Sequence, residues 1–330
     1  SSGKLIFTTT SLNTATIVGI ANLADGSTST AYTVTETELR AVNTLSELKA
    51  KVMTMRDESV YRSAYFMMTG YAKVKNPAVG ADPTLINIPA LESGQTATLE
   101  CTLQLERTDS KVQFVVTSEK PSDKDWTDFS FQPTGWTVKQ VPLQSLILPK
   151  DEPDVNGNWD ADGDAAVYFD SASYEFETFT RNGTLYTGGS FAFYMPENRK
   201  KYKKEITGDI NIENIGEFYA LRDQREKSTD TEGNTALGDF EYANANSTYV
   251  EITGLLSYFE EKDGVEQLVY ANVRFIVHLG YANGMNVHDF VNDYDTKRNH
   301  FYTYNIKVKG VNNIEVDVEG GGDSRPGYDV

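Results

Sequence analysis

The sequence predicts an all-β protein with minor helices, arranged as two antiparallel β-sandwich domains in tandem. Short segments in which apolar and polar residues alternate recur along the chain, and this period of two is typical of strands with one buried face. Aromatic residues make up 12% of the sequence, and Gly and Pro separate the alternating segments, as in many β-proteins. A length of 330 residues favours two domains over one.

A helix is expected early in the chain, because apolar residues recur there at steps of three and four. These residues are Leu39, Val42, Leu45, Leu48 and Val52. A second helix is expected over about residues 214–227, where Ile215, Phe218 and Leu221 share one side.

The other elements are predicted to be strands. Leu99 to Leu105 alternates, and after a turn over residues 107–110 the pattern resumes from Val112 to Val116, which predicts a hairpin. Cys101 lies on the apolar face of the first strand, so it is expected to be a buried residue rather than a nucleophile. Further strands are expected around Phe191 to Met195, Val250 to Ile252, Val273 to Leu279 and Tyr302 to Val308.

The segment from Leu148 to Asp154 is the best position for a domain boundary, because it joins a strand-like stretch to a region rich in Asp, Asn and Gly. Residues 1–149 are therefore assigned to an N-terminal sandwich. Residues 150–330 are assigned to a C-terminal sandwich that ends in a strand and a tail.

The overall charge excludes one class of partner. The formal charge of −18 argues against nucleic acid, because phosphates are held by clusters of Lys and Arg. No apolar run reaches the roughly 18 residues that a membrane-spanning helix needs.

One segment has the spacing of a calcium loop, with oxygen ligands at alternate positions. The candidate ligands are Asn158, Asp160, Asp162 and Asp164. The twelfth position of such a loop needs a bidentate Glu but is Phe169, so the motif is incomplete. The alternatives are a weak calcium site and a solvated acidic linker, and no other cofactor is expected.

The sequence carries no recognisable catalytic constellation. The three histidines, His278, His288 and His300, lack the spacing of metal ligands, and His278 is expected on the outer face of a strand. No nucleophile elbow accompanies them, and no pair of carboxylates is marked out for acid–base chemistry. The chain is therefore not expected to be an enzyme, and a β-sandwich hydrolase is kept only as a third alternative.

The clearest alternating pattern lies near the end of the chain. Tyr302 to Val308 predicts a core strand, and Gly310 with Asn312 and Asn313 predicts a turn. A second strand follows, in which Ile314, Val316 and Val318 share one face and carboxylates occupy the other.

This closing segment resembles that of the fimbrillins of Bacteroidales, the subunits of type V pili. The shared pattern runs from Arg298 to Gly310 and includes Tyr-x-Tyr-Asn-Ile-x-Val-x-Gly. The segment from Phe191 to Asn198, with its Tyr-Met-Pro-Glu end, resembles a strand end of the same family. Weaker matches are Val250 to Gly254, Val273 to Val277, Leu103 to Val116 and Trp136 to Val138.

The resemblance implies two transthyretin-like β-sandwich domains and a lipoprotein precursor that is exported to the outer membrane of a Gram-negative bacterium. It also implies that an Arg-specific protease removes an N-terminal strand, and that the vacated groove accepts a strand from a neighbouring subunit. The turn-like start at Ser1-Ser2-Gly3 suits a chain whose first strand is absent. A tag remnant or an unresolved terminus would give the same pattern.

By resemblance, the protein is a structural or tip subunit of a cell-surface fimbrium, which assembles by donor strand exchange into homo- or hetero-polymers and contributes to cell adhesion. The residues expected to contact another subunit are Val311, Ile314, Val316 and Val318. The alternative for Val311 to Val318 is that it forms the last strand of its own domain.

A different function is also open. The protein would then be a surface adhesin that does not polymerise and that binds a host protein or a glycan. Its candidate binding residues are Trp126, Trp136 and Trp159, because aromatic rings can stack on sugars.

Overall fold

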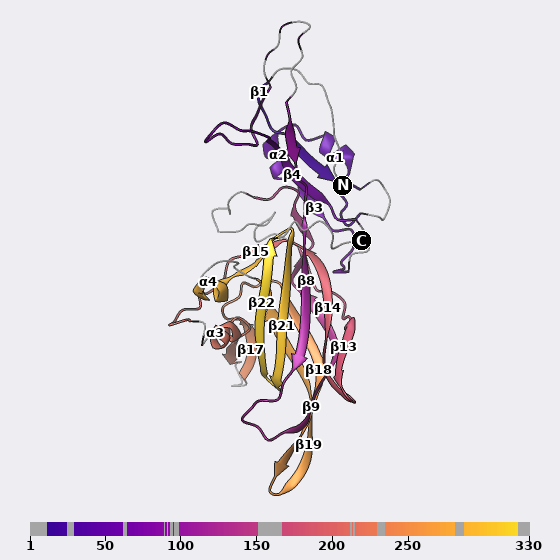
Figure 1. The fold of residues 1–330 in the computed structure, drawn as a ribbon, viewed down its shortest axis with the longest axis vertical. Coiled ribbons are helices and arrows are strands. Elements are labelled where there is room, and N and C mark those ends of the chain that lie inside the picture. The colour runs from indigo at the N-terminus through magenta and orange to yellow at the C-terminus, as the bar shows by residue number, and fades with distance from the viewer. Residues whose placement is uncertain are drawn as a thin grey trace.

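The fold is that of a computed structural model, which describes residues 12–24, 30–61, 65–88, 90, 92, 95, 99–150, 167–211, 213, 215–229, 235–280 and 287–322. The predicted all-β class with minor helices is confirmed. Figure 1 shows an elongated molecule, in which small sheets and two short helices lie at one end and a large curled sheet fills the other.

The large sheet has eight strands, in the order β19-β18-β9-β14-β8-β21-β22, with β13 beside β14. Its members are β8 (Asp109–Ser118), β9 (Thr127–Lys139), β13 (Thr178–Asn182), β14 (Leu185–Pro196), β18 (Tyr249–Lys262), β19 (Val265–His278), β21 (His300–Gly310) and β22 (Asn313–Gly322). β9 meets β14 through a single parallel pair, Phe131 with Thr187, whereas its other ladder is long. The sheet therefore has two walls, β9 with β18 and β19, and β14 with β8, β21 and β22.

The domain division predicted at residues 149 and 150 does not follow this sheet. β8 and β9 precede residue 149, yet they lie between strands that follow residue 150. The polar segment after Leu148 resembles a linker in composition, but composition does not report which strands pair. Two strands of the large sheet thus come from the predicted N-terminal domain.

The smaller end of the molecule is built from residues before β8. Its elements are β1 (Leu12–Ala15), β2 (Val18–Ala21), α1 (Glu36–Arg40), α2 (Leu45–Lys49), β3 (Val52–Thr54), β4 (Met68–Val74), β5 (Ile86–Ile88), β6 (Cys101–Leu103) and β7 (Glu106–Arg107). β4 is the centre of a four-stranded sheet, with β2 on one side and β6 and β7 on the other. β1 pairs with β5 in a separate ladder.

Short ladders and helices connect and cover these sheets. The remaining elements are β10 (Val141–Pro142), β11 (Gln144–Leu146), β12 (Tyr168–Phe169), β15 (Asn198–Lys200), α3 (Ile215–Leu221), β16 (Arg225–Thr229), β17 (Thr235–Phe240), α4 (Val287–Asn292) and β20 (Tyr294–Thr296). β10 pairs with β12, β11 with β3, β15 with β20 and β16 with β17. In Figure 1, α3 and α4 lie beside the β22 edge of the large sheet.

The core of the large sheet is aromatic. Trp136 stacks on Phe191 with 4.3 Å between ring centroids, Phe191 on Phe114 at 5.0 Å, and Phe114 on Tyr304 at 4.8 Å. Phe191, Phe114 and Tyr304 stand opposite one another in the ladders of β14, β8 and β21. This ring stack joins β9 to the opposite wall and is continuous with the buried aliphatic residues of β18 and β19.

Several predicted elements differ from the observed ones. The early helix is two short helices, α1 and α2, and neither has a buried residue. The predicted hairpin is wrong: β6 pairs with β4, and Thr108, Asp109 and Ser110 are buried rather than forming an exposed turn. The second helix is confirmed only over α3, because β16 begins at Arg225.

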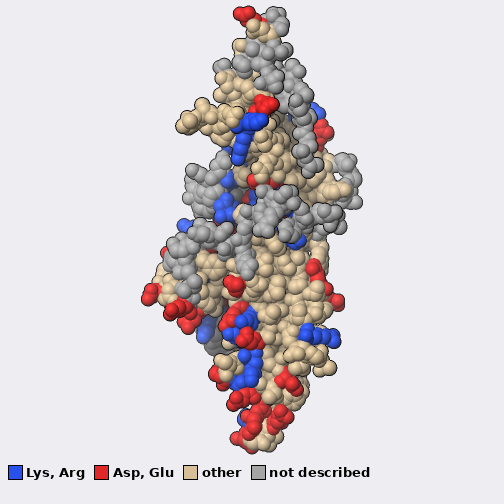
Figure 2. All heavy atoms as spheres, in the orientation of Figure 1, with Lys and Arg blue, Asp and Glu red and all other residues tan. Residues whose placement is uncertain are grey.

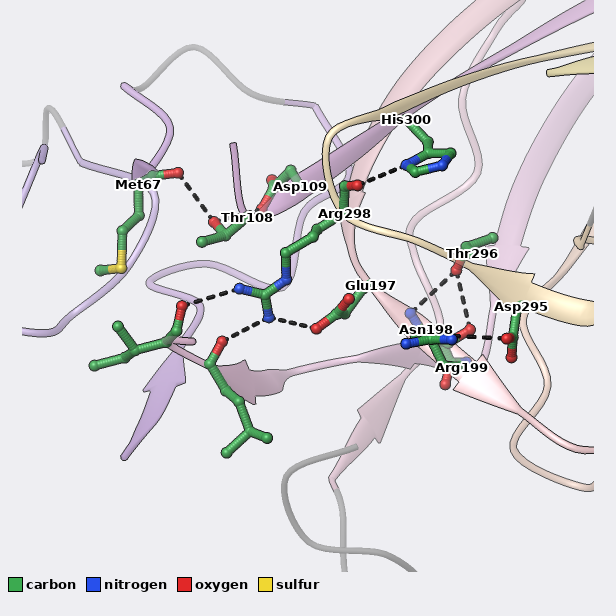
Figure 3. A network of polar contacts seen from close by, with 12 residues as sticks. Met67, Thr108, Asp109, Glu197, Asn198, Arg199, Asp295, Thr296, Arg298 and His300 are labelled. Atoms are coloured by element: carbon green, nitrogen blue, oxygen red, sulfur yellow. Dashed lines mark hydrogen bonds and ion pairs between the residues drawn. The ribbon is translucent and has the colours of Figure 1, made fainter. Parts of the chain in front are cut away.

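Hydrogen bonds and an ion pair connect the small end of the molecule to the large sheet (Figure 3). Arg298 is buried, forms an ion pair with Glu197, and donates from Nη1 to Ile147 O at 2.9 Å and from Nη2 to Leu146 O at 2.8 Å. Thr108 Oγ1 donates to Met67 O at 3.1 Å. These contacts fix the position of β4 and β11 relative to β8 and β21.

Candidate assembly site

A shallow groove of mixed apolar and uncharged polar residues lies between β2 and the two short helices. It has a volume of about 430 Å³. We call it the β2 groove. It is lined by Thr16, Val18, Ile20, Leu39, Val42, Asn43, Thr44, Leu45 and Leu48. None of them carries a charge and six of the nine are apolar, so the groove suits a segment with uncharged, mainly apolar side chains.

The helical wall of the groove is held by capping contacts. Thr35 caps α1: its Oγ1 accepts from Glu38 N at 3.2 Å, while Glu38 Oε2 accepts from Thr35 N at 2.8 Å. The bond from Thr35 N and a second one from Thr35 Oγ1 to the same carboxylate lower the pKa of Glu38. Thr44 caps α2 in the same way, since its Oγ1 accepts from Glu47 N at 3.1 Å. Such caps stabilise helices that are too short to form alone.

The strand wall of the groove is one face of β2. Val18 and Ile20 lie on this face because alternate residues of a strand point the same way. The opposite face is tightly covered: a Cβ at Gly70, the partner of Gly19, would lie 2.0 Å from Gln104 O. The chain between β6 and β7 therefore closes one face of this sheet, while the other face is open to the groove.

β2 is also an edge strand. It pairs with β4 on one side, and no strand among the described residues pairs with its other side. An open edge presents unpaired backbone N–H and C=O groups, to which another strand can add. The groove would then receive the alternate side chains of that added strand.

The four residues predicted to contact another subunit belong to the hairpin of β21 and β22 in their own chain. β22 pairs along β21, with Ile314 opposite Val308, Val316 opposite Ile306 and Val318 opposite Tyr304. Val318 is buried and Ile314 and Val316 are half-buried against the core, whereas Val311, in the turn before β22, is exposed. The structure brings the last three together on one face, as the alternation predicts, but against their own sheet.

The other candidate binding residues are placed differently. Trp136 is 1% exposed, so it is a core residue and the prediction that it stacks on a sugar is wrong. Trp126 is half-buried, with its ring stacked 3.9 Å from that of Tyr258. Trp159 and the predicted calcium ligands Asn158, Asp160, Asp162 and Asp164 lie outside the described residues, and the calcium site stays a prediction.

His278 lies on the outer face of β19, as predicted, but it is fully buried there. Its Nδ1 lies 2.6 Å from Asp223 Oδ1, and the ring of Phe240 packs edge-on at 4.4 Å. Burial lowers the pKa of His278, and the hydrogen bond to Asp223 opposes this effect. The burial of His278 could not be predicted from the pattern of β19 alone. The residues that cover it, Phe240 and Asp223, belong to β17 and to the turn after α3, which are distant in the sequence.

Among the described residues there is neither a candidate metal site nor a helix that could span a membrane. Within the described ranges, no three His, Cys, Asp or Glu side chains are grouped so that they could hold a metal ion. The helices in the same ranges are all too short or too polar to cross a membrane.

Comparison with known proteins places this fold. A solved structure of a candidate cell adhesion protein from Parabacteroides distasonis matches 94% of this chain and 83% of its own, with a TM-score of 0.52 and 13% identity. The chain shares the fold of this candidate adhesion protein. The resemblance expected from the sequence is thus confirmed at the level of the fold.

Further solved structures are similar to a lesser degree. The tip fimbrial protein Mfa3 from Porphyromonas gingivalis, with a C-terminal truncation, matches 92% of this chain and 79% of its own, with a TM-score of 0.42 and 14% identity. A second candidate cell adhesion protein from Parabacteroides distasonis matches 95% and 77%, with a TM-score of 0.48 and 14% identity. No protein-family model and no curated protein matches the chain.

Only one wall of the β2 groove leaves a recognisable pattern in the sequence. The apolar stripe from Leu39 to Leu48 is visible as a pattern, and it does form one wall. The other wall, Val18 and Ile20, is too short an alternation to stand out from a Thr-rich segment. That β2 is an edge strand depends on long-range pairing, which no local pattern reports.

Proposed function

We propose that the chain is a subunit of a cell-surface fimbrium and that its β2 groove accepts a strand from a neighbouring subunit. The observation that carries this proposal is that no described strand pairs with the outer edge of β2, which lies beside an uncharged groove. Backbone hydrogen bonds from an added strand would satisfy the edge, and alternate apolar side chains would fill the space between Val18, Ile20 and Leu48.

Burial in the groove supplies the driving force of this step. Val18, Ile20, Leu39 and Leu48 are only half-buried, and Leu45 is 41% exposed. Covering apolar surface stabilises by about 25 cal/mol per Å². A strand with apolar residues at alternate positions would cover these side chains without placing a charge in the groove.

The position of β22 favours an accepting role over a donating one. To donate Val311 to Val318, the chain would have to remove β22 from β21 and expose Val318, which is 6% exposed here. A subunit at the tip of a fimbrium needs to accept a strand but not to donate one. We therefore favour a terminal position, with the donor role of β22 as the alternative.

The remaining parts of the proposal follow from the same role. A fimbrial subunit acts at the cell surface, and we propose export as a lipoprotein precursor to the outer membrane, with other fimbrial subunits as partners. The role is structural and adhesive rather than catalytic. A glycan-binding adhesin that does not polymerise is less well supported, since Trp136 is buried and Trp126 is covered by Tyr258.

The test is incorporation of groove variants into fimbriae. Leu45→Lys and Val42→Lys place a cation in the β2 groove at positions that α2 and its preceding turn leave accessible. Leu85→Lys is the matched control, because Leu85 is 51% exposed and outside the groove. Each variant is expressed in cells that bear the fimbriae, and fimbriae sheared from the cells are probed for the chain.

We expect the control to be incorporated like the wild type, and the groove variants to reach the surface but to be missing from sheared fimbriae. Thermal unfolding of the purified variants shows that each is folded. Normal incorporation of folded groove variants would overturn the proposal.

A further inference from the structure

We propose that the hairpin of β18 and β19 is a second binding surface, independent of the β2 groove, for a cationic extended segment of another protein. The segment would alternate Lys or Arg with apolar residues and add as a strand to the open edge of β19. The hairpin lies at the opposite end of the molecule from β2 (Figure 1).

The hairpin offers a long and regular edge. β18 and β19 pair from Tyr249 with His278 to Lys262 with Val265 without a bulge, and Asp263 and Gly264 form the turn with positive φ angles of 55° and 76°. β19 is the last strand of the sheet, and among the described residues only β18 pairs with it. Its outer row of backbone N–H and C=O groups therefore lacks a strand partner among the described residues, and only at His278 do side chains, those of Asp223 and Arg222, bond to it.

This edge lacks the devices that usually protect edge strands. Natural edges carry Pro, bulges, Lys or short strands, which prevent pairing with other chains. β19 has 14 residues, without Pro, Lys or a bulge. Its only cation, Arg274, lies 3.8 Å from Glu251 of β18. An unprotected edge of this length indicates a surface that pairs.

The outer face of the hairpin adds apolar surface beside the edge. Tyr270 is 71% exposed and Leu268 is 55% exposed. They project on the same face of β19, where Leu268 stands opposite Phe259 and Tyr270 opposite Ser257. An added strand would place its own side chains next to Leu268 and Tyr270, at the distance of cross-strand neighbours.

The charge next to this patch selects a cationic partner. Glu261 stands directly opposite Glu266 near the turn, and like charges at such positions are destabilising. No ion pair joins either carboxylate to a cation within the described residues. Figure 2 shows acidic side chains gathered at this end of the molecule. A Lys or Arg on an added strand would relieve the repulsion between Glu261 and Glu266.

The same charges disfavour a second copy of this chain as the occupant. The chain has a formal charge of −18, and its own exposed alternating strand, β22, carries Glu315 and Asp317 on its outer face. Pairing β22 of one copy with β19 of another would bring these carboxylates toward Glu261 and Glu266. The partner is therefore a different polypeptide of opposite charge.

The test uses the full chain and a capped synthetic peptide that alternates Lys and Val. Binding is measured by titration calorimetry at physiological ionic strength, and amide hydrogen exchange locates the protected strand. A peptide that alternates Glu and Val is the charge control. Glu261→Lys/Glu266→Lys is the test variant, and Glu213→Lys/Glu217→Lys, at exposed positions around α3, makes the same change in net charge elsewhere.

We expect saturable binding of the Lys peptide and new protection in β19. The Glu261→Lys/Glu266→Lys variant should bind about tenfold more weakly, and the α3 variant within about twofold of wild type. Leu268→Ser/Tyr270→Ser should also weaken binding, at exposed positions that leave the fold intact. The groove variant Leu45→Lys should bind normally, which separates this proposal from that for β2.

Three results would overturn the inference. They are the absence of saturable binding, equal losses for the hairpin and α3 charge reversals, and equal binding of the Glu peptide. Protection of β2 instead of β19 would assign the peptide to the groove and would also overturn it.

Discussion

Arg298 and Glu197 form a buried ion pair although they lie 101 residues apart in the sequence. They belong to the two segments that carry the resemblance to fimbrillins, Phe191 to Asn198 and Arg298 to Gly310. Arg298 also donates to the carbonyls of Leu146 and Ile147. One side chain thus joins the end of β14, the start of β21 and the end of β11 (Figure 3).

Removing either partner of this pair should be costly. Glu197→Gln and Arg298→Met should each lower the free energy of unfolding by about 3–5 kcal/mol, because the remaining partner stays buried without its counter-charge. Chemical denaturation of purified variants measures the loss. Lys309→Met, which breaks an exposed pair with Glu315, is the control and should cost at most about 1 kcal/mol. Similar losses for buried and exposed pairs would contradict this account.

The aromatic stack predicts a second set of stabilities. Phe114 touches Phe191 on one side and Tyr304 on the other and is fully buried. Phe114→Ala should therefore lower the free energy of unfolding by about 3–5 kcal/mol, from lost burial and the cavity left behind. Phe301→Ala, on the same ladder but 40% exposed, should cost far less. Denaturant titration measures the free energy of unfolding of both variants. Equal losses for Phe114→Ala and Phe301→Ala would contradict a core that is centred on the aromatic stack.

The last strand should contribute to stability if it belongs to its own sheet. Val318→Ala should destabilise by about 1–3 kcal/mol, because Val318 is buried against the core. Val311→Ala, at an exposed turn position, should change stability by less than about 0.5 kcal/mol. The measurement is thermal unfolding of the two variants side by side. If Val318→Ala proved neutral in the monomer, β22 would be free to act as a donor strand.

A pair of half-buried carboxylates makes stability depend on pH. Burial raises the pKa of Asp295 to about 7, the nearby Asp293 adds to this rise, and Arg199, 3.4 Å away, opposes it. The folded state therefore holds this proton more tightly than the unfolded state. The resulting stability is present at acid pH and is lost as the pH rises through about 7.

Asp295→Asn should remove this dependence, because the amide resembles the protonated acid and does not ionise. Relative to wild type, the variant should gain stability between about pH 5 and about pH 8, at about 1.4 kcal/mol for each pKa unit between the folded and unfolded states. Denaturation curves at both pH values measure the change. A constant difference across this range would show that Asp295 ionises in the folded protein as it does in the unfolded chain.

Local sequence patterns predicted where the strands lie far better than they predicted which strands pair with each other. Alternation identified Tyr302 to Val308, and the turn signals at Gly310 and Asn312 identified the hairpin with β22, because both are read within a few residues. The predicted boundary at residues 149 and 150 failed to follow the sheets, since β8 pairs with β14 and β21 across it. Such long-range pairing depends on the whole core and leaves no local mark.

The early helix was predicted in the right region but as one continuous element, for a related reason. The stripe from Leu39 to Val52 was continuous in sequence, but Thr44 caps a second helix and Val52 opens β3. The apolar residues of this stripe do not enter the core as a continuous helix face. They line the β2 groove, where Leu39 and Leu48 pack against the core and stay half-exposed, and Leu45 is 41% exposed. An incoming strand would cover the parts of these side chains that remain exposed.

The most direct test of the central claim is to ask what lies in the β2 groove within an assembled fimbrium. Leu45→Cys in a Cys101→Ser background gives one reactive thiol at the groove, to which a maleimide-linked photo-cross-linker is attached. Leu85→Cys in the same background is the control outside the groove. After illumination of fimbriae that contain the labelled chain, mass spectrometry identifies the cross-linked segment. We predict that Leu45→Cys, and not Leu85→Cys, is joined to an extended, alternating apolar segment of another subunit. The absence of such an adduct from fimbriae that contain the labelled chain would contradict the account.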